Sequence, residues 1–191
     1  GLDGHHFFQM IFDENGASSL EWYRQKFAPD FQIPELLNMA AEAEPGCRGL
    51  TAVPSAGHYE ELSGFRNIKE YHRHGHFVRA ILESTALSLV RIFNILRGDS
   101  QPGGIVGTGG GAKSRTWGKI KADLTGMDFM IPECTESACL GAAMIGAIGT
   151  RTYEDPGEIT GAWLKVAERL TPDPVNRKKY ADWLDKVKRV D

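Results

Sequence analysis

Apolar residues recur along this chain at two different spacings, which predict a mixture of strands and helices. Short apolar runs bounded by turn residues are typical of buried strands, and they occur at 5–12, 49–53, 103–106 and 128–132. Apolar positions three and four residues apart predict helices. The segments with this spacing are 18–28, 34–44, 68–96, 113–126, 135–148, 156–170 and 175–190. Gly75 is expected to break or begin the helix within 68–96. We interpret 54–65 as a loop because it has no sustained period.

The segment from Gly103 to Gly126 combines a strand, a glycine-rich turn and a helix. Residues 107–111 contain four glycines in five positions, and helical spacing begins at Lys113. Glycine leaves backbone N–H groups unshielded and allows positive φ, so a ligand can approach the main chain. The helix start that follows favours an anion. The pattern therefore predicts a nucleotide site, and the alternative is a tight strand-to-helix turn with no ligand.

Two nucleotide motifs can be tested on these residues. A P-loop requires glycine immediately before its lysine, but Lys113 follows Ala112. The dinucleotide pattern G-x-G-x-x-G/A does fit, at Gly107, Gly109 and Ala112, with Glu133 about 20 residues further on. A dinucleotide-binding oxidoreductase domain therefore stays open as an alternative. It requires another parallel strand after the next helix, where the pattern is helical only.

Composition narrows the classes of protein. The 191 residues carry a formal net charge of −3 and are 41% apolar, which fits one domain with a buried core. Basic residues are scattered, so we expect no nucleic-acid binding. We expect no membrane association either, because no apolar run reaches about 18 residues and no signal peptide opens the chain. The three cysteines lack metal spacing, which predicts free thiols and a cytoplasmic location.

Two polar clusters are weaker candidates. Histidines at 72, 74 and 76 suggest a metal site, but only the first and third share a helix face, and no acidic or cysteine partner accompanies them. We therefore expect no metal bound by the protein itself. Residues 58–61 (His-Tyr-Glu-Glu) could contact a ligand from the predicted loop, although a plain solvated loop is the interpretation that we favour.

Two consecutive blocks carry a family resemblance. GGGAKSRTWGKIKADLTG (109–126) followed by PECTESACLGAAMIGAIG (132–149) resembles the C-terminal domain of the FGGY carbohydrate kinases. Further similar segments are 15–22, 49–54, 76–84 and 171–180, the last resembling the tail of xylulokinase-like members. The chain departs from the family after Pro54, where it reads SAGHYEELSG. Because of that departure, the resemblance does not identify the sugar substrate.

The resemblance implies an α/β fold of the actin-like, ribonuclease-H-like type, with a mixed sheet flanked by helices and extra C-terminal helices. Residues 1–191 would form the C-terminal, nucleotide-binding domain of a two-domain kinase, and the first residue, glycine rather than methionine, fits a piece of a longer protein. ATP, carrying Mg²⁺, would bind in the cleft between the domains. Whether the protein forms a homodimer is left open.

The resemblance also assigns site residues. The cofactor-binding residues would be Gly109, Gly110, Gly111, Ala112, Ser114 and Arg115. The glycines would approach the ribose and α-phosphate, and the last two residues would lie on the adenine side. Segment 136–143, rich in Ala and Gly, would lie next to the interdomain contact, with simple tight packing as the alternative.

The catalytic residues of the family would lie elsewhere. Its catalytic aspartate, its phosphate loop and most of its sugar contacts belong to an N-terminal domain absent from this chain. We therefore expect no catalytic residue here and no sugar phosphorylation by this polypeptide alone. A non-catalytic nucleotide-sensing domain is a third hypothesis.

Overall fold

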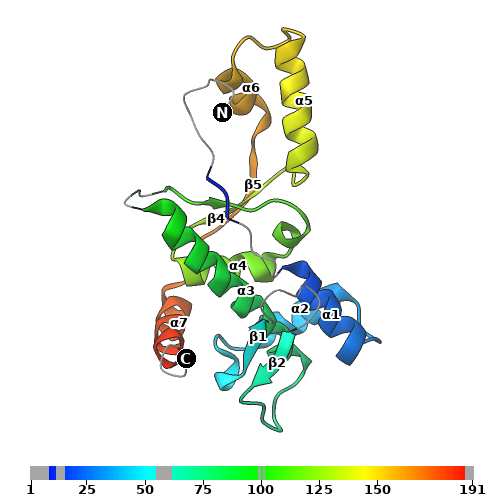
Figure 1. The fold of residues 1–191 in the computed structure, drawn as a ribbon, viewed down its shortest axis with the longest axis vertical. Helices are drawn as coiled ribbons and strands as arrows, with labels where there is room; N and C mark the ends of the chain where they lie inside the picture. Colours follow the sequence, from blue (N-terminus) through cyan, green and yellow to red (C-terminus); the bar gives the residue numbers. More distant parts are fainter. Residues whose placement is uncertain (1–8, 12–15, 55–61, 99, 101, 188–191) are drawn as a thin grey trace. The chain divides into compact units, whose positions relative to one another are not determined.

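The computed structural model describes residues 9–11, 16–54, 62–98, 100 and 102–187. The chain divides into two compact units, 1–102 with 179–191 and 103–178 (Figure 1). The elements of the first unit are α1 (Ala17–Phe27), α2 (Ile33–Glu42), η1 (Cys47–Gly49), β1 (Thr51–Pro54), β2 (Leu62–Arg66) and α3 (His74–Arg97). Those of the second are β3 (Ile105–Val106), η2 (Gly110–Lys113), α4 (Arg115–Thr125), β4 (Phe129–Pro132), α5 (Ser137–Gly149), α6 (Pro156–Trp163) and β5 (Val166–Leu170). The unit boundary falls within α7 (Pro174–Val187).

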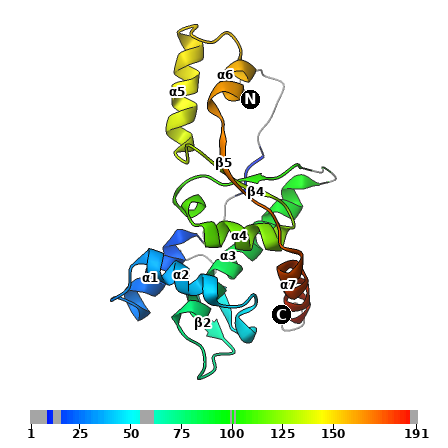
Figure 2. The same ribbon diagram turned by 180° about the vertical axis from the view of Figure 1, so that it is seen from behind.

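The first unit is built around α3. Helices α1 and α2 and the antiparallel pair β1–β2 gather along it in both ribbon views (Figures 1 and 2). Gly75 on α3 lies so close to the Met39 carbonyl that a Cβ atom would overlap it, so this helix contact requires glycine. The buried apolar side chains of this core include Leu20, Tyr23, Leu36, Ala40, Leu50, Val78, Ile81 and Leu82.

Several boundaries in the first unit differ from the predicted ones. The long helix begins at His74, beside Gly75, where the sequence indicated a break or a start, so residues 68–73 of the predicted segment are not helical. Residues 62–66, predicted as loop, form β2. The predicted strand at 49–53 is confirmed with a small shift, as β1. Most of the predicted strand 5–12 lies outside the described residues, and residues 9–11 have no regular structure. The candidate ligand residues 58–61 also lie outside the described part.

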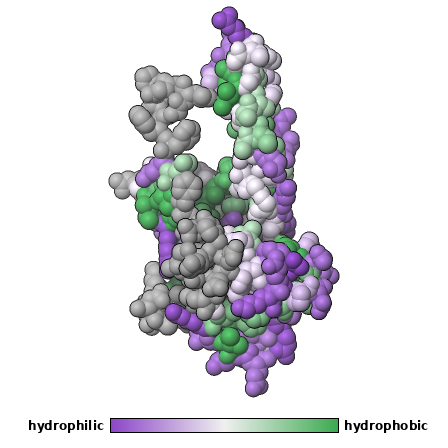
Figure 3. Space-filling model, turned by 45° about the vertical axis from the view of Figure 1, so that its right-hand side comes forward, coloured by the Kyte–Doolittle hydropathy of each residue, from purple (hydrophilic) through white to green (hydrophobic). Residues whose placement is uncertain are grey.

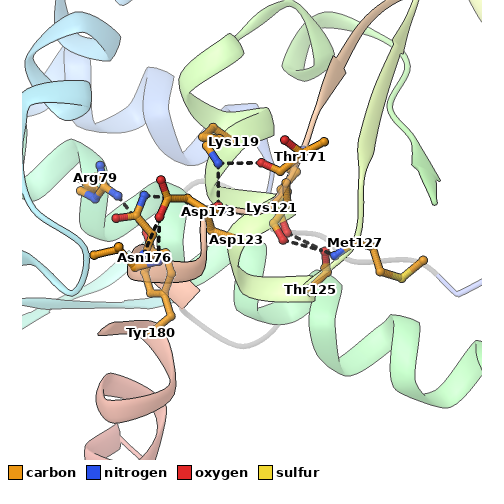
Figure 4. A network of polar contacts seen from close by, with 12 residues as sticks. Arg79, Lys119, Lys121, Asp123, Thr125, Met127, Thr171, Asp173, Asn176 and Tyr180 are labelled. Carbon is orange, nitrogen blue, oxygen red and sulfur yellow. Dashed lines mark hydrogen bonds and ion pairs between the residues drawn. The ribbon is translucent and has the colours of Figure 1, made fainter. Parts of the chain in front are cut away.

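A buried ion pair connects α3 to α7 within the first unit. Glu83 is fully buried, and its Oε1 accepts hydrogen bonds from Arg79 Nε at 2.9 Å, Tyr180 OH at 2.8 Å and Gly46 N at 3.0 Å. Arg79 Nη2 also donates to Tyr180 OH at 2.9 Å; both side chains are drawn in Figure 4. Every charged group of this cluster therefore has a partner, as burial requires.

The second unit contains a mixed sheet in the order β3–β4–β5. Strand β3 runs parallel to β4, and β5 runs antiparallel to β4. Helix α4 packs on this sheet through Gly118, where a Cβ would lie 2.7 Å from Leu170 Cδ1. The buried cluster beneath the helix consists of Ala122, Phe129, Ile131 and Leu170, with Ile105 packed against it.

One predicted helix in the second unit is wrong over its second half. The segment 156–170 was expected to be helical throughout, but α6 ends at Trp163 and 166–170 form β5. The residues Val-Ala-Glu-Arg-Leu carry mixed propensities, and pairing with β4 decides their conformation. Because β5 is antiparallel to β4, it is not the parallel strand that the dinucleotide-binding alternative requires.

Helix α4 is fixed to the start of α7 by a buried carboxylate. Asp123 is 2% exposed and accepts hydrogen bonds from Lys119 Nζ at 2.9 Å, Asp173 N at 2.7 Å and Asn176 Nδ2 at 3.0 Å (Figure 4). Lys119 Nζ also donates to the Thr171 carbonyl at 2.7 Å. All five residues belong to the second unit, so this network orders the segment that follows β5 against the helix that follows the glycines.

Candidate functional site

The residues Gly107–Gly111, called the glycine loop below, form the predicted turn between a strand and a helix. Gly107 N donates to the Met130 carbonyl at 2.9 Å, and Gly109 N donates to the Thr135 carbonyl at 2.8 Å. The short η2 turn follows, and Ser114 then caps α4 by accepting a hydrogen bond from Trp117 N at 3.2 Å. The predicted strand, turn and helix are therefore all present, with one turn of 3₁₀ helix between the last two.

The glycines of this loop serve different purposes. A Cβ at Gly107 would overlap the Phe129 ring, and one at Gly111 would lie 3.1 Å from Trp117 Cζ3, so packing explains these two. Gly109 has φ of +73°, which favours glycine. Gly110 has neither requirement: its φ is not positive, and a Cβ would meet no atom within 4 Å. A turn alone therefore does not explain the glycine at 110.

Most predicted cofactor-binding residues lie at the surface of the second unit. Gly110 and Arg115 are exposed, and Gly109, Gly111 and Ser114 are half-buried. Ala112, in contrast, is 2% exposed and lies in the core. Its contribution is therefore to the packing of η2, and only its main chain can belong to a ligand site.

Two ion pairs surround the start of α4, and sequence reasoning missed both acidic partners. Lys113 Nζ lies 3.4 Å from Glu136 Oε1, and Arg115 Nε donates to Glu168 Oε1 at 2.6 Å. Glu136 is the N-cap residue of α5, and its side chain makes no capping bond there. Glu168 belongs to β5, so only the correct strand assignment would have placed it near Arg115.

An aromatic pair and a lysine lie beneath the glycine loop. Lys121 Nζ is 4.4 Å from the centroid of the Trp117 ring and 5.2 Å from that of Phe129, the same rings that contact Gly111 and Gly107. Among the described residues no carboxylate pairs with this ammonium group. Burial lowers the pKa of Lys121 to about 8, because desolvation disfavours the charged form.

We therefore expect Lys121 to weaken the fold near neutral pH. Because its pKa is lower in the folded than in the unfolded chain, stability should rise with pH between about 8 and 10.5, where only the unfolded chain binds the proton. Lys121→Met should therefore raise the free energy of unfolding by about 1 kcal/mol near pH 7, and by less as pH rises. Urea denaturation at several pH values measures this difference. The exposed Lys178→Met is the control, and a K121M protein no more stable than it would contradict the expectation.

The three histidines and the aromatic residues around them lie in the first unit. Each histidine Nδ1 has a hydrogen-bond partner. Lys69 N donates to His72 at 3.0 Å and Arg73 N donates to His76 at 3.1 Å, both within three residues, whereas Tyr23 OH on α1 lies 2.8 Å from His74 Nδ1. The described residues contain no group of three or more potential metal ligands. A cavity of about 530 Å³ lies here, and none of its lining residues belongs to the glycine loop.

Two further properties of the described residues concern cysteines and membranes. The three cysteines are all unpaired, Cys47 buried and Cys134 and Cys139 exposed. None of the described helices combines the length and apolar character that crossing a bilayer demands.

Comparison with known proteins identifies the class of protein. Residues 15–150 match the C-terminal domain of the FGGY family of carbohydrate kinases, and the chain belongs to that family. Curated relatives include a xylulose kinase of Staphylococcus epidermidis, 29% identical over 86% of this chain and 35% of the relative. A gluconokinase of Bacillus subtilis is 30% identical over 87% of this chain and 36% of its own length. The chain thus spans about a third of the curated relatives it matches.

Solved structures of kinases share the fold. A ligand-bound xylulose kinase from Lactobacillus acidophilus superimposes with a TM-score of 0.80 at 21% identity, covering 92% of this chain and 37% of the other. A xylulose kinase from Rhodospirillum rubrum gives 0.75 at 26% identity, covering 91% and 37%. A Plasmodium falciparum glycerol kinase crystallised with ADP gives 0.74 at 18% identity, covering 91% and 36%. The predicted actin-like fold, with helices flanking a mixed sheet, is confirmed.

Proposed function

We propose that this chain is the nucleotide-binding domain of a kinase that transfers the γ-phosphate of ATP to a sugar hydroxyl. The nucleotide would lie against Gly109–Gly111, with Ser114 and Arg115 on the adenine side. The observation that carries the proposal is the exposed Gly110, which neither packing nor backbone conformation requires to be glycine. Family membership supports the reaction class, and the free thiols are compatible with the cytoplasmic location that we propose.

The glycine loop would bind and orient the nucleotide rather than perform the transfer. Main-chain groups at the start of α4 present the positive end of the helix dipole, which favours phosphate. Phosphoryl transfer also needs charge neutralisation and in-line positioning of the acceptor. Glu136 and Glu168, which pair with basic residues beside the start of α4, belong to no group of three or more potential metal ligands in the described part of the chain. Mg²⁺ would therefore arrive on the phosphates.

A second domain would complete the enzyme. Helix α5 buries only Met144 of its thirteen residues, and Ile145 is 56% exposed. Figure 3 shows weakly polar and apolar surface along this helix. An exposed helix rich in Ala and Gly allows a close helix contact, so we propose that the N-terminal domain of the full kinase packs against it and supplies the catalytic aspartate and the sugar contacts.

Ligand binding distinguishes this proposal from the dinucleotide alternative. Calorimetric titration of the chain with ATP, ADP and NAD should show binding of the two adenine nucleotides and none, or much less, of NAD. The chain alone should produce no sugar phosphate from ATP with any pentose or hexose, whereas the full-length enzyme should phosphorylate at least one. Preferential binding of NAD would reverse the proposal. Sugar phosphorylation by the isolated chain would refute the need for a second domain.

A further inference from the structure

An exposed ion pair, Lys113 with Glu136, lies at the edge of the glycine loop. Lys113 and Glu136 lie 3.4 Å apart, and their side chains are 63% and 66% exposed. Attraction between exposed charges is weak because water screens it. Each partner can therefore exchange the other for a different ion with little loss. A phosphate group is the obvious competitor for the lysine.

The main chain fixes Glu136 beside the open part of the loop. Its neighbour Thr135 accepts the hydrogen bond from Gly109 N at 2.8 Å, and its own carbonyl accepts the one from Leu140 N at 3.0 Å in the first turn of α5. The space beside Gly109 and Gly110 is open, because a Cβ atom added at either residue would meet no other atom within 4 Å. The negatively charged Glu136 is therefore the residue next to Thr135, which is hydrogen-bonded to the glycine loop.

Building on the proposed function, we propose that Glu136 sets how strongly this site discriminates between nucleotides by their phosphate charge. In the free chain its carboxylate holds Lys113. A bound diphosphate or triphosphate takes over the lysine and leaves Glu136 as an unpaired negative charge nearby. The carboxylate thus opposes binding in two ways, by competition and by repulsion, and both increase with the charge of the ligand. Adenosine, which is uncharged, meets neither effect.

Glu136→Gln tests this directly, because the amide keeps the shape of the side chain and removes its charge. Titration with adenosine, ADP and ATP at low salt and without divalent metal should show unchanged adenosine binding, and ADP and ATP binding about three- to tenfold tighter. The gain should shrink as salt approaches about 0.5 M. Glu133→Gln is the matched control: it removes the same charge from an exposed side chain that forms no ion pair in the described part of the chain.

A double-mutant cycle with Lys113→Gln separates competition from repulsion. If the carboxylate competes for the lysine, E136Q should strengthen ATP binding less in the K113Q background than in the wild type. Equal affinities of wild type and E136Q for ATP would overturn this inference while leaving the proposed function intact. Equal tightening of adenosine and ATP would overturn it as well, since a change in loop shape would then be the cause. Absence of any adenine-ligand binding by wild type and variants would instead refute the proposed function.

Discussion

Glu83→Gln is expected to lower the free energy of unfolding by about 3–5 kcal/mol, because it leaves the Arg79 guanidinium buried without its counter-ion. Arg79 is 6% exposed, and water cannot replace the lost carboxylate. The change would also weaken the hydrogen bonds from Tyr180 OH and Gly46 N, which converge on the same Oε1 atom. Urea denaturation followed by circular dichroism measures the loss.

A matched control isolates the effect of burial. Glu21 pairs with Arg24 on α1, also within one helical turn, but its side chain is 43% exposed. Glu21→Gln removes the same charge and should cost less than about 1 kcal/mol, as exposed pairs usually do. Similar losses for E21Q and E83Q would show that the buried cluster contributes no more than a surface pair. The double variant Arg79→Met with Glu83→Leu should recover much of the E83Q loss, since it removes both buried charges.

The sequence predicted the glycine loop well because its signals are local. The strand before it, the four glycines and the apolar spacing of α4 all lie within a few residues of one another. The open space beside Gly110 could not be predicted from the sequence. A glycine can be required because a neighbouring side chain leaves no room for a Cβ atom, or because a ligand needs access to the main chain, and the sequence does not distinguish the two. Gly107 and Gly110 look alike in the sequence and differ only through Phe129, more than fifteen residues away.

Features that join distant segments escaped sequence reasoning. Glu83 and Tyr180 are 97 residues apart, and Asp123 and Asn176 are 53 apart, so no local period indicates either contact. Strand β5 was mistaken for helix because the residues that pair with it lie in β4, across two intervening helices. Its misassignment also hid Glu168 from the candidate site. Pairing between distant segments therefore determines both the strand conformation of β5 and the position of Glu168 beside Arg115.

Gly110→Ala should weaken nucleotide binding without weakening the fold. The added methyl group meets no protein atom within 4 Å, so stability should stay unchanged or rise by up to about 1 kcal/mol through the unfolded chain. The same methyl group would occupy the space where the nucleotide approaches the main chain. An overlap of this kind should weaken ATP binding by about tenfold or more. Calorimetry with ATP and thermal unfolding of the same sample measure both quantities.

Two other glycines make the interpretation of G110A specific. Gly107→Ala forces a methyl group into the Phe129 ring and should destabilise the chain by about 1–3 kcal/mol. Any loss of ATP binding in this variant should therefore follow from the loss of stability. Gly161→Ala on α6 also meets no atom within 4 Å and should change neither property by much. If G110A binds ATP as tightly as G161A does, the space beside Gly110 is not where the nucleotide lies. Loss of binding in a G110A protein of wild-type stability places the ligand against the loop, because no change in packing remains to explain it.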